Sequence, residues 1–316
     1  MHNIAIVIPS LNPDEKLLEV VGAALGKGFR TIIVVNDGSS SEYNKYFEQI
    51  EKHKECVVLK HYKNFGKGRS LKTAFNYFLN TYPNYIGLIT VDADNQHHID
   101  DIVNCAKTLE ANSLASNNNN IILGSRDFDL ENVPKKSKLG NKITRFVFRI
   151  LCGIKINDTQ TGLRAIPTNL VKEFLDIDGE RYEYETNMLI EAKQKNCNFQ
   201  EIEIQTIYIE DNKSSHFNPV HDSIKIYLLI FKHLFRFGIV GGLSTIIDLG
   251  LFSLFMLIFN DFSPKEKIFL STLIARIFSS LFNYYSNSKV VFNNTANKKI
   301  TMTKYYILAI IQMGLS

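Results

Sequence analysis

The feature that most constrains the fold is a regular alternation of two kinds of segment, which continues to about residue 225. The runs typical of strands are "IAIVIPS", "TIIVVND", "CVVLKHY", "YIGLITVDAD" and "NIILGSR". Between them, stretches such as "DEKLLEVVGAALGKG" and "GRSLKTAFNYFLNTY" repeat their apolar residues at helical spacing. Because strands that alternate with helices usually pair in parallel, we predict an α/β fold with a mostly parallel sheet covered on both faces.

The pattern changes beyond residue 235, where two long apolar segments follow one another. Residues 237–259 and 268–292 are each about long enough to cross a bilayer, and a third apolar run begins at Tyr305. Two buried helices of a water-soluble domain are the alternative interpretation. Each segment holds one internal charge, Asp248 or Arg276. At 1.5 Å of rise per residue both charges lie roughly 18–20 Å from the flanking cations, so we expect them to face one another. Because an isolated charge in hydrocarbon is costly, they should form a pair or share an anionic ligand.

Basic residues flank both apolar segments and orient them. They are Lys225, Lys232 and Arg236 before the first segment, and Lys289, Lys298, Lys299 and Lys304 after the second. Because Lys and Arg accumulate on the cytoplasmic side of membrane helices, both ends should face the cytoplasm. We therefore expect a multi-pass protein of the cell membrane. Its first domain, residues 1–227, is cytoplasmic, and α-helical transmembrane segments occupy residues 228–316.

Composition adds three weaker constraints. The formal charge of +4 and the pI near 8.7 weakly favour an anionic partner, such as a nucleotide, a phospholipid or a nucleic acid. The four cysteines are scattered without a C-x-x-C, which indicates neither a zinc site nor a disulfide framework and suits a reducing compartment. The first strand begins almost at once, without the basic region and cleavage site of a signal peptide, so we expect none.

The segment "VDADNQH" raises the main chemical question, because Asp92 and Asp94 follow a buried strand with one residue between them. Ligands bind at the carboxyl ends of strands in open α/β sheets. Two carboxylates this close repel each other unless a positive charge shares the site. An isolated D-x-D is also typical of a solvated loop, so the other strand ends have to decide between the two interpretations.

Two further loops offer groups suited to a nucleotide. Asp37, in "NDGSS" after the second strand, could hold a ribose or a base edge, although this sequence is also typical of an ordinary turn. In "NFGKGRS" the glycines, Lys67 and Arg69 open a helix, where amides and cations suit phosphate. The spacing is not that of a Walker A motif. His97, His98 and His216 do not form a convincing metal cluster, and loop or packing roles suit them better.

Taken together, "IPSLNP", "NDGSS", "NFGKGRSLKTAF", "VDADNQH", "GSR" and "DTQTGLRA" resemble the ordered motifs of family 2 glycosyltransferases, most closely the polyprenyl-phosphate (dolichol-phosphate-type) hexosyltransferases. The likeness continues through "RYEYETNMLIEAK" and residues 207–227. The tail, with "FRFGIVGGLSTIIDLGLF" and "NYYSNSKVVF", resembles a GtrA-like membrane domain. That family usually has four spans, and because this chain ends in the third we expect a truncated domain. Pro13 stands where the family's first motif usually has an acid.

The resemblance implies a GT-A-type (Rossmann-like) catalytic domain with a divalent cation, Mg²⁺ or Mn²⁺, bound by Asp92, Asp94 and Gln96. Asp92 would lie nearer the ribose and Asp94 nearer the cation. Further residues expected around the nucleotide sugar are Pro9, Asn12, Asp37, Lys67, Arg126, Gln160, Arg164 and Lys213. The expected catalytic residues are Asp94, Arg126 and Glu185. For these cations and the glutamine, ordinary surface and turn roles are the alternative.

The implied reaction is an inverting displacement at the anomeric carbon, with the nucleoside diphosphate as leaving group. The acceptor would be a polyprenyl phosphate, which is undecaprenyl phosphate in bacteria. A phosphate monoester, with a second pKa near 6, is already ionised and needs no base. Glu185 would therefore orient the acceptor or support the site more than it abstracts a proton.

The segment 135–153 offers the lipid acceptor a route from the bilayer. Its cations are Lys138, Lys142, Arg145 and Arg149, and its apolar residues are Leu139, Ile143, Phe146, Val147 and Ile150. A basic amphipathic helix of this kind lies in a membrane interface. A helix packed on its own domain, with a solvated basic face, is the alternative.

We therefore predict a hexosyltransferase that is bound to the membrane, uses a nucleotide sugar and a lipid phosphate, forms a homo-oligomer and binds no nucleic acid. One rival is a transporter or flippase component whose α/β domain only senses nucleotide. Another is a transferase that acts on protein or polysaccharide, which would need a stronger base. The sequence does not distinguish a UDP-linked from a GDP-linked donor, nor one sugar from another.

Overall fold

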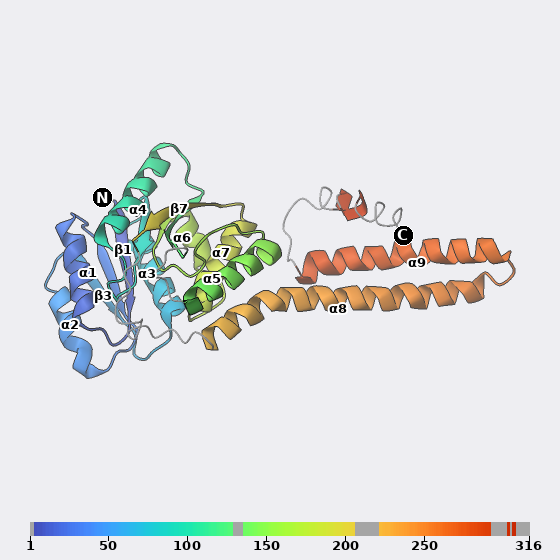
Figure 1. Ribbon diagram of the computed structural model, residues 1–316, viewed down its shortest axis with the longest axis horizontal. Coiled ribbons are helices and arrows are strands. Elements are labelled where there is room, and N and C mark those ends of the chain that lie inside the picture. The colour runs from blue at the N-terminus through green and yellow to red at the C-terminus, as the bar shows by residue number, and fades with distance from the viewer. Residues whose placement is uncertain (1–2, 129–134, 206–220, 292–301, 304, 308–316) are drawn as a thin grey trace. The chain divides into compact units, whose positions relative to one another are not determined.

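The computed structural model describes residues 3–128, 135–205, 221–291, 302–303 and 305–307. The chain divides into two compact units, Met1–Ile226 and Tyr227–Ser316. The first unit is built on one sheet and the second on two long helices (Figure 1).

Seven strands form the sheet of the first unit, in the order β3-β2-β1-β4-β6-β5-β7. The strands are β1 (Ile4–Ser10), β2 (Ile32–Asn36), β3 (Cys56–Lys60), β4 (Gly87–Thr90), β5 (Asn120–Arg126), β6 (Arg164–Pro167) and β7 (Asn198–Ile204). Only β6 runs antiparallel to its neighbours, and the other paired strands are parallel. The mostly parallel sheet expected from the sequence is confirmed.

Helices cover the sheet in two layers. One layer contains α1 (Glu15–Gly26), α2 (Asn44–Ile50) and α4 (Ile99–Leu114), and the other contains α3 (Lys67–Thr81), α6 (Thr168–Phe174) and α7 (Glu183–Gln194). The remaining helical pieces of this unit are η1 (Ser41–Tyr43), α5 (Lys135–Val147) and the π-helical turn η2 (Phe148–Cys152). In the first layer, α1 and α4 pack on alternate residues of β1, namely Ile4, Ile6 and Ile8, as the two-residue period of a strand requires.

The sequence analysis identified five strands and missed β6 and β7. β6 is only four residues long, too short to show a period of its own. Its direction matters for the site: because β6 is antiparallel, its first residue, Arg164, pairs with the last residue of β4, Thr90. The loop "DTQTG" before β6 is thereby brought to the carboxyl end of β4, where the D-x-D begins.

The second unit is an antiparallel hairpin of α8 (His221–Ile258) and α9 (Pro264–Ser286), followed by the π-helical turn η4 (Asn287–Val291). Among the described residues, only the stretch Phe235–Ile258 is long and apolar enough to cross a membrane. The second span expected at 268–292 does not reach this standard: α9 ends at Ser286 and includes charged residues in its first turn and at Arg276. Most of the third apolar run lies outside the described residues.

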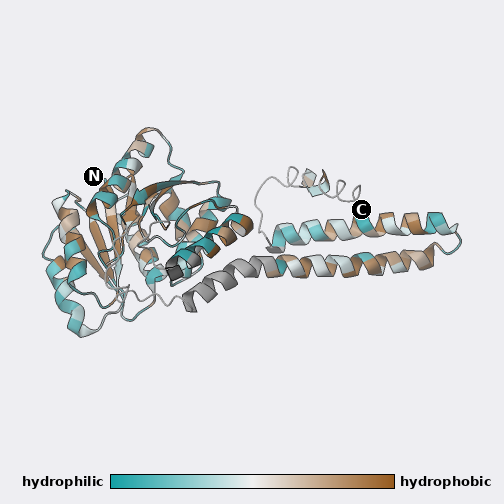
Figure 2. Ribbon diagram, in the orientation of Figure 1, coloured by the Kyte–Doolittle hydropathy of each residue, from teal (hydrophilic) through white to brown (hydrophobic). Residues whose placement is uncertain are grey.

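Apolar residues recur along α8 (brown in Figure 2), and many of their side chains are exposed. They include Ile246, Leu249 and Leu257, which are 60–76% exposed. An exposed apolar surface of this extent is typical of a helix that faces lipid. Small residues lie where the helices touch, with Ser244 on α8 buried against the face of α9 that carries Ser271, Ala275 and Ser279.

Asp248 and Arg276 form an ion pair between the two helices, as their equal depth in the sequence predicts. Arg276 Nε lies 3.4 Å from Asp248 Oδ2. The other carboxylate oxygen of Asp248 accepts a hydrogen bond from the Ser279 hydroxyl at 2.8 Å. The hydroxyl of Ser244 in turn donates to the Ser279 carbonyl at 3.1 Å. The charge inside each apolar segment thus has a partner of opposite sign within the hairpin.

Candidate active site

A cleft of about 530 Å³ opens where β1, β2 and β4 end, at the carboxyl edge of the sheet. Six of the residues predicted for the site line it: Pro9, Asn12, Asp37, Lys67, Asp92 and Asp94. A smaller hollow of about 40 Å³ shares Asp92 and contains three more, Gln96, Arg126 and Gln160. Because the carboxyl ends of parallel strands share one edge, loops far apart in the sequence meet here.

The loop after β1 shapes one wall of the cleft through its own hydrogen bonds. Asn12 adopts a left-handed backbone with φ of 48°. Its N–H donates to the Ser39 hydroxyl at 2.8 Å, and its side-chain oxygen accepts from the Ser40 N–H at 3.1 Å. Asp14, next to the proline that replaces the family's usual acid, accepts from the Lys16 N–H and caps α1. Asn12 thus joins the first two loops of the cleft.

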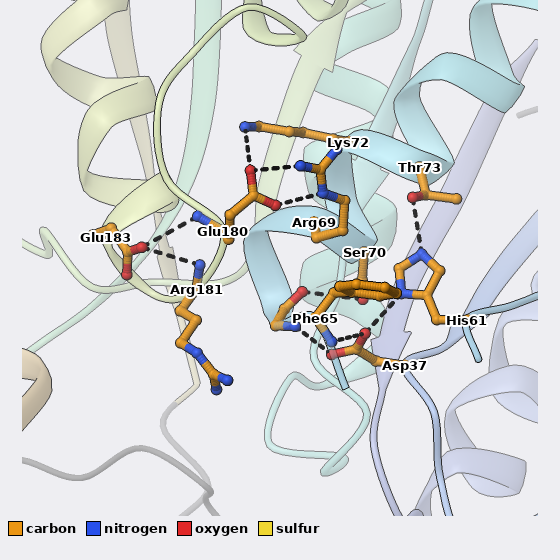
Figure 3. Close-up of polar contacts among 11 residues, drawn as sticks. Asp37, His61, Phe65, Arg69, Ser70, Lys72, Thr73, Glu180, Arg181 and Glu183 are labelled. Atoms are coloured by element: carbon orange, nitrogen blue, oxygen red, sulfur yellow. Dashed lines mark hydrogen bonds and ion pairs between the residues drawn. The ribbon is translucent and has the colours of Figure 1, made fainter. Parts of the chain in front are cut away.

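Asp37 lines the cleft, and its carboxylate holds the start of α3 (Figure 3). Its oxygens accept hydrogen bonds from the N–H groups of Phe65 (3.0 Å) and Gly66 (2.7 Å). One of them also lies 2.7 Å from His61 Nδ1, and His61 Nε2 is 2.9 Å from the Thr73 hydroxyl. The side chain is buried. These contacts make Asp37 a support for the "NFGKG" loop.

Lys67 supplies positive charge to one of the two carboxylates of the D-x-D, that of Asp92. Its ammonium lies 2.7 Å from Asp92 Oδ1 and 2.9 Å from Glu185 Oε2, the acid from α7. Burial alone would raise the pKa of Asp92, but Lys67 outweighs it and holds that pKa well below its usual range. Burial likewise lowers the pKa of Lys67, yet Asp92 and Glu185 together raise it above its ordinary value.

Asp94 has no such cationic partner within the described residues. Its carboxylate accepts a hydrogen bond from the Gln96 N–H at 3.2 Å. Burial, followed by repulsion from Asp92, raises the pKa of Asp94. A divalent cation would relieve both effects, because hard carboxylate oxygens are the ligands that Mg²⁺ and Mn²⁺ prefer. The residues therefore fit a cation, although the described part of the chain brings no group of three His, Cys, Asp or Glu side chains together.

The smaller hollow is lined by polar groups that hold Asp92 and Arg126. His97 is buried, and its Nε2 lies 3.5 Å from Asp92 Oδ2 without the alignment of a hydrogen bond. The Arg126 guanidinium makes a bidentate ion pair with the buried carboxylate of Asp158, with Nε 2.6 Å and Nη2 3.1 Å from its two oxygens. Asp158 also accepts from the Gln160 N–H at 3.0 Å. The Asp158 carboxylate thus holds both Arg126 and Gln160, two of the residues predicted for the site.

Gly162 belongs to the same "TQTG" turn and explains why that motif ends in glycine. A Cβ on Gly162 would lie 2.2 Å from Asp92 Oδ2, which no side chain can tolerate. β4, the strand that leads into the D-x-D, holds this turn in place, because the Thr90 hydroxyl donates to the Gly162 carbonyl at 2.7 Å. The turn therefore packs directly against the D-x-D, and its sequence permits the close approach.

Arg164 is not placed where the sequence analysis expected it. Its side chain is 2% exposed and lines neither the cleft nor the smaller hollow. The guanidinium donates to the carbonyls of Thr161 (3.0 Å) and Glu185 (2.7 Å), so it joins the "TQTG" turn to α7. Burial lowers the pKa of this guanidinium. We therefore assign Arg164 a positioning role beneath the site.

The structure changes two further expectations. Arg69, predicted to suit phosphate, instead pairs with Glu180, its Nη2 2.9 Å from Oε1. Arg181 and Tyr182, which the sequence analysis did not select, line the cleft from the loop before α7. The available signal was their place at the start of the matched segment "RYEYETNMLIEAK". Lys213 and His216 lie outside the described residues.

Comparison with known proteins agrees with this arrangement. Residues 5–173 match the glycosyl transferase family 2, and residues 236–316 match the GtrA/DPMS transmembrane domain. A protein of Methanocaldococcus jannaschii is 30% identical over 73% of this chain and 93% of its own length. The UDP-N-acetylglucosamine–dolichyl-phosphate N-acetylglucosaminyltransferase of Methanococcus voltae is 28% identical over 66% of this chain and 86% of its own.

Among solved structures, mannosyl-3-phosphoglycerate synthase from Rubrobacter xylanophilus aligns with a TM-score of 0.52 at 13% identity, covering 74% of this chain and 73% of that one. At that identity the likeness bears on the fold alone, and it agrees with the GT-A-type sheet expected from the sequence. The two-part resemblance seen in the sequence is confirmed. The chain belongs to glycosyl transferase family 2 and carries a GtrA/DPMS transmembrane domain.

Proposed function

We propose that this protein transfers a hexose, with inversion, from a nucleotide sugar to a polyprenyl phosphate at the cytoplasmic face of the membrane. The observation that carries the proposal is the pair of carboxylates, Asp92 and Asp94, which line a cleft of about 530 Å³ at the carboxyl ends of the strands. The M. voltae relative, named for transfer to dolichyl phosphate, supports a lipid phosphate as the acceptor.

Asp92, Asp94 and Gln96 would hold Mg²⁺ or Mn²⁺, which supplies positive charge for the leaving nucleoside diphosphate. The chain's own groups prepare the rest of the site. Lys67 keeps Asp92 ionised, and Arg126, oriented by Asp158, adds a fixed positive charge beside it. The raised pKa of Asp94 supports a cation at this position, because that carboxylate lacks a compensating charge.

The contacts of Glu185 favour a positioning role. One of its carboxylate oxygens accepts from Lys67 at 2.9 Å, and the other is buried without a hydrogen-bond partner among the described residues. A carboxylate held by an ammonium is a poor base. Because a lipid phosphate is already ionised, its attack on the sugar needs no proton to be removed.

The acceptor can approach along α5 and η2, whose exposed face is apolar. Ile143, Phe146 and Ile150 recur at helical spacing and are 46%, 64% and 60% exposed, whereas Asn141 and Thr144 on the other side are buried. A helix that turns its apolar side chains outward is suited to a lipid surface, and the exposed Lys142 and Arg149 would meet anionic headgroups.

We further propose that the protein is a multi-pass membrane protein with its catalytic unit, residues 1–227, in the cytoplasm and its membrane unit at residues 228–316. The apolar stretch Phe235–Ile258 supports the first span, and the cations flanking it and the second segment support this orientation. The homo-oligomer stays a prediction.

The test is a transfer assay with the full chain in vesicles that contain polyprenyl phosphate. A panel of UDP-linked and GDP-linked sugars, UDP-N-acetylglucosamine included, is supplied with Mg²⁺ or Mn²⁺. We expect one donor class to release its nucleoside diphosphate and to yield a glycolipid in equal amount. Nucleotide binding without glycolipid for any donor would instead identify a sensor, such as the nucleotide-binding part of a transporter.

A further inference from the structure

We propose that Arg181 binds the diphosphate of the nucleotide sugar, and that Glu180 holds the loop that presents it. This inference rests on the proposed function and adds a phosphate-binding residue to the donor site. Arg181 lies in the segment between α6 and α7, directly before the first turn of α7.

The charges that line the cleft single out Arg181. The other two cations there already have acidic partners: Lys67 lies 2.7 Å from Asp92, and Lys16 lies 3.7 Å from Asp14. Arg181 has no carboxylate partner for its guanidinium in the described part of the chain, and its side chain is exposed. A guanidinium offers several N–H donors in one plane, which suits the oxygens of a diphosphate.

The backbone of Arg181 is fixed although its side chain is not. The Glu183 carboxylate accepts hydrogen bonds from the N–H groups of Glu180 and Arg181, each at 3.2 Å. These bonds tie the loop to the first turn of α7 (Figure 3). In the same view the Arg181 guanidinium extends away from both glutamates, without an interaction to either. The loop is therefore placed before a ligand arrives, and only the side chain has to be ordered.

Glu180 joins this loop to α3. Its carboxylate receives Arg69, at 2.9 Å from Nη2, and Lys72, at 3.3 Å from Nζ (Figure 3). Its carbonyl accepts from the Arg69 N–H at 2.9 Å. Arg69, which the sequence suggested for phosphate, thus holds the loop that carries Arg181.

Gly66 makes this contact possible. Its backbone has a φ of 106°, and a Cβ at this position would lie 2.5 Å from the Glu180 carbonyl and 2.6 Å from the Arg181 Cγ. The stem of Arg181 therefore runs directly over the glycine that opens α3. Any larger residue at position 66 would displace the loop that carries Glu180 and Arg181. The glycine therefore lets this loop pack against the start of α3.

The experiment measures binding of UDP, GDP and the corresponding nucleosides to the detergent-solubilised full chain by calorimetry, with Mg²⁺ present. For whichever diphosphate binds, Arg181→Gln should weaken binding about tenfold and leave nucleoside binding unchanged, because only the charge-assisted contact is lost. Arg181→Lys should recover part of the loss. Arg30→Gln is the matched control. It removes the same charge from an exposed side chain just before β2, at the amino ends of the strands and away from the cleft.

The role of Glu180 is tested by a double-mutant cycle. Glu180→Gln should weaken diphosphate binding roughly threefold in the wild-type chain, and have no further effect in the Arg181→Gln chain, because the two residues act through one contact. Independent losses would overturn the positioning role. Equal diphosphate binding by the wild type and Arg181→Gln, with unchanged melting curves, would overturn the inference alone. A wild-type chain that binds neither diphosphate would overturn the proposed function with it.

Discussion

The donor cleft and the membrane hairpin both contain an ion pair between helices or loops distant in the sequence, but their charge balance differs. In the cleft, Lys67 is shared by Asp92 and Glu185, and Asp94 lies nearby with a raised pKa. In the hairpin, Asp248 meets Arg276 one to one, and Ser279 satisfies the remaining carboxylate oxygen.

The difference indicates what each cluster is for. A balanced pair with a hydroxyl partner needs nothing more, and in an apolar segment it stabilises the contact between the two helices. A cluster with more carboxylates than cations is incomplete until positive charge arrives. The excess of acid at the strand ends therefore indicates a binding site, and the balance in the hairpin indicates a structural role.

The largest effect is expected for the unpaired carboxylate of the cleft. Asp94→Ala should reduce turnover on the order of 10³-fold, because the cation that would stabilise the charge developing on the leaving diphosphate loses a ligand. Donor binding should weaken chiefly when metal is present. Asp100→Ala, which removes an exposed acid from the same region, should leave the rate close to that of the wild type. Metal-dependent transfer retained by Asp94→Ala would remove the catalytic assignment.

Removing the shared cation should cost stability as well as activity. Lys67→Met leaves Asp92 and Glu185 without their partner, and we expect the free energy of unfolding to fall by about 3 kcal/mol. Thermal melting followed by circular dichroism measures this change. Lys72→Met is the control, because Glu180 retains Arg69 and the loss should stay below about 1 kcal/mol. If the two variants lost equal free energy of unfolding, Lys67 would stabilise the protein no more than Lys72 does.

A double-mutant cycle tests the balanced pair. Asp248→Asn and Arg276→Gln should each destabilise the hairpin, and the double variant should recover part of the loss, with a coupling energy of about 1 kcal/mol. Unfolding of the full chain in detergent or bicelles measures the effect. Strictly additive losses would show that the two charges act separately, and the contrast with the cleft would then fail.

The smallest effect concerns the second region that we propose to face lipid, on α5 and η2. Replacing Phe146 and Ile150 by Ser should raise the KM for a long-chain lipid phosphate by roughly threefold to tenfold and spare a short, water-soluble analogue. The loss is limited because α8 already tethers the chain near the bilayer. Leu114→Ser, at an 89% exposed position on α4, is the matched control. Equal losses on both acceptors would make this helix structural.

The sequence by itself determined the features that depend on local order. Strands and helices alternate because apolar residues repeat with periods of two and about 3.6, and the carboxylates of Asp92 and Asp94 reach the edge of the sheet because they directly follow a strand. The meeting of Asp248 with Arg276 followed from counting residues along two antiparallel helices, since each residue advances a helix by about 1.5 Å.

Only the tertiary structure decided which charges are already used. Arg69 and Glu180 stand 111 positions apart, and nothing in either segment shows that they meet. Likewise, Arg164 lies beneath the site because β6 enters the sheet antiparallel, between β4 and β5. A cation held by a carboxylate is less available to phosphate, and which cations are held in this way depends on how distant segments pack. Packing gives Lys67 the carboxylate of Glu185 and gives Arg69 that of Glu180. Arg181 instead lines the cleft without an acidic partner among the described residues.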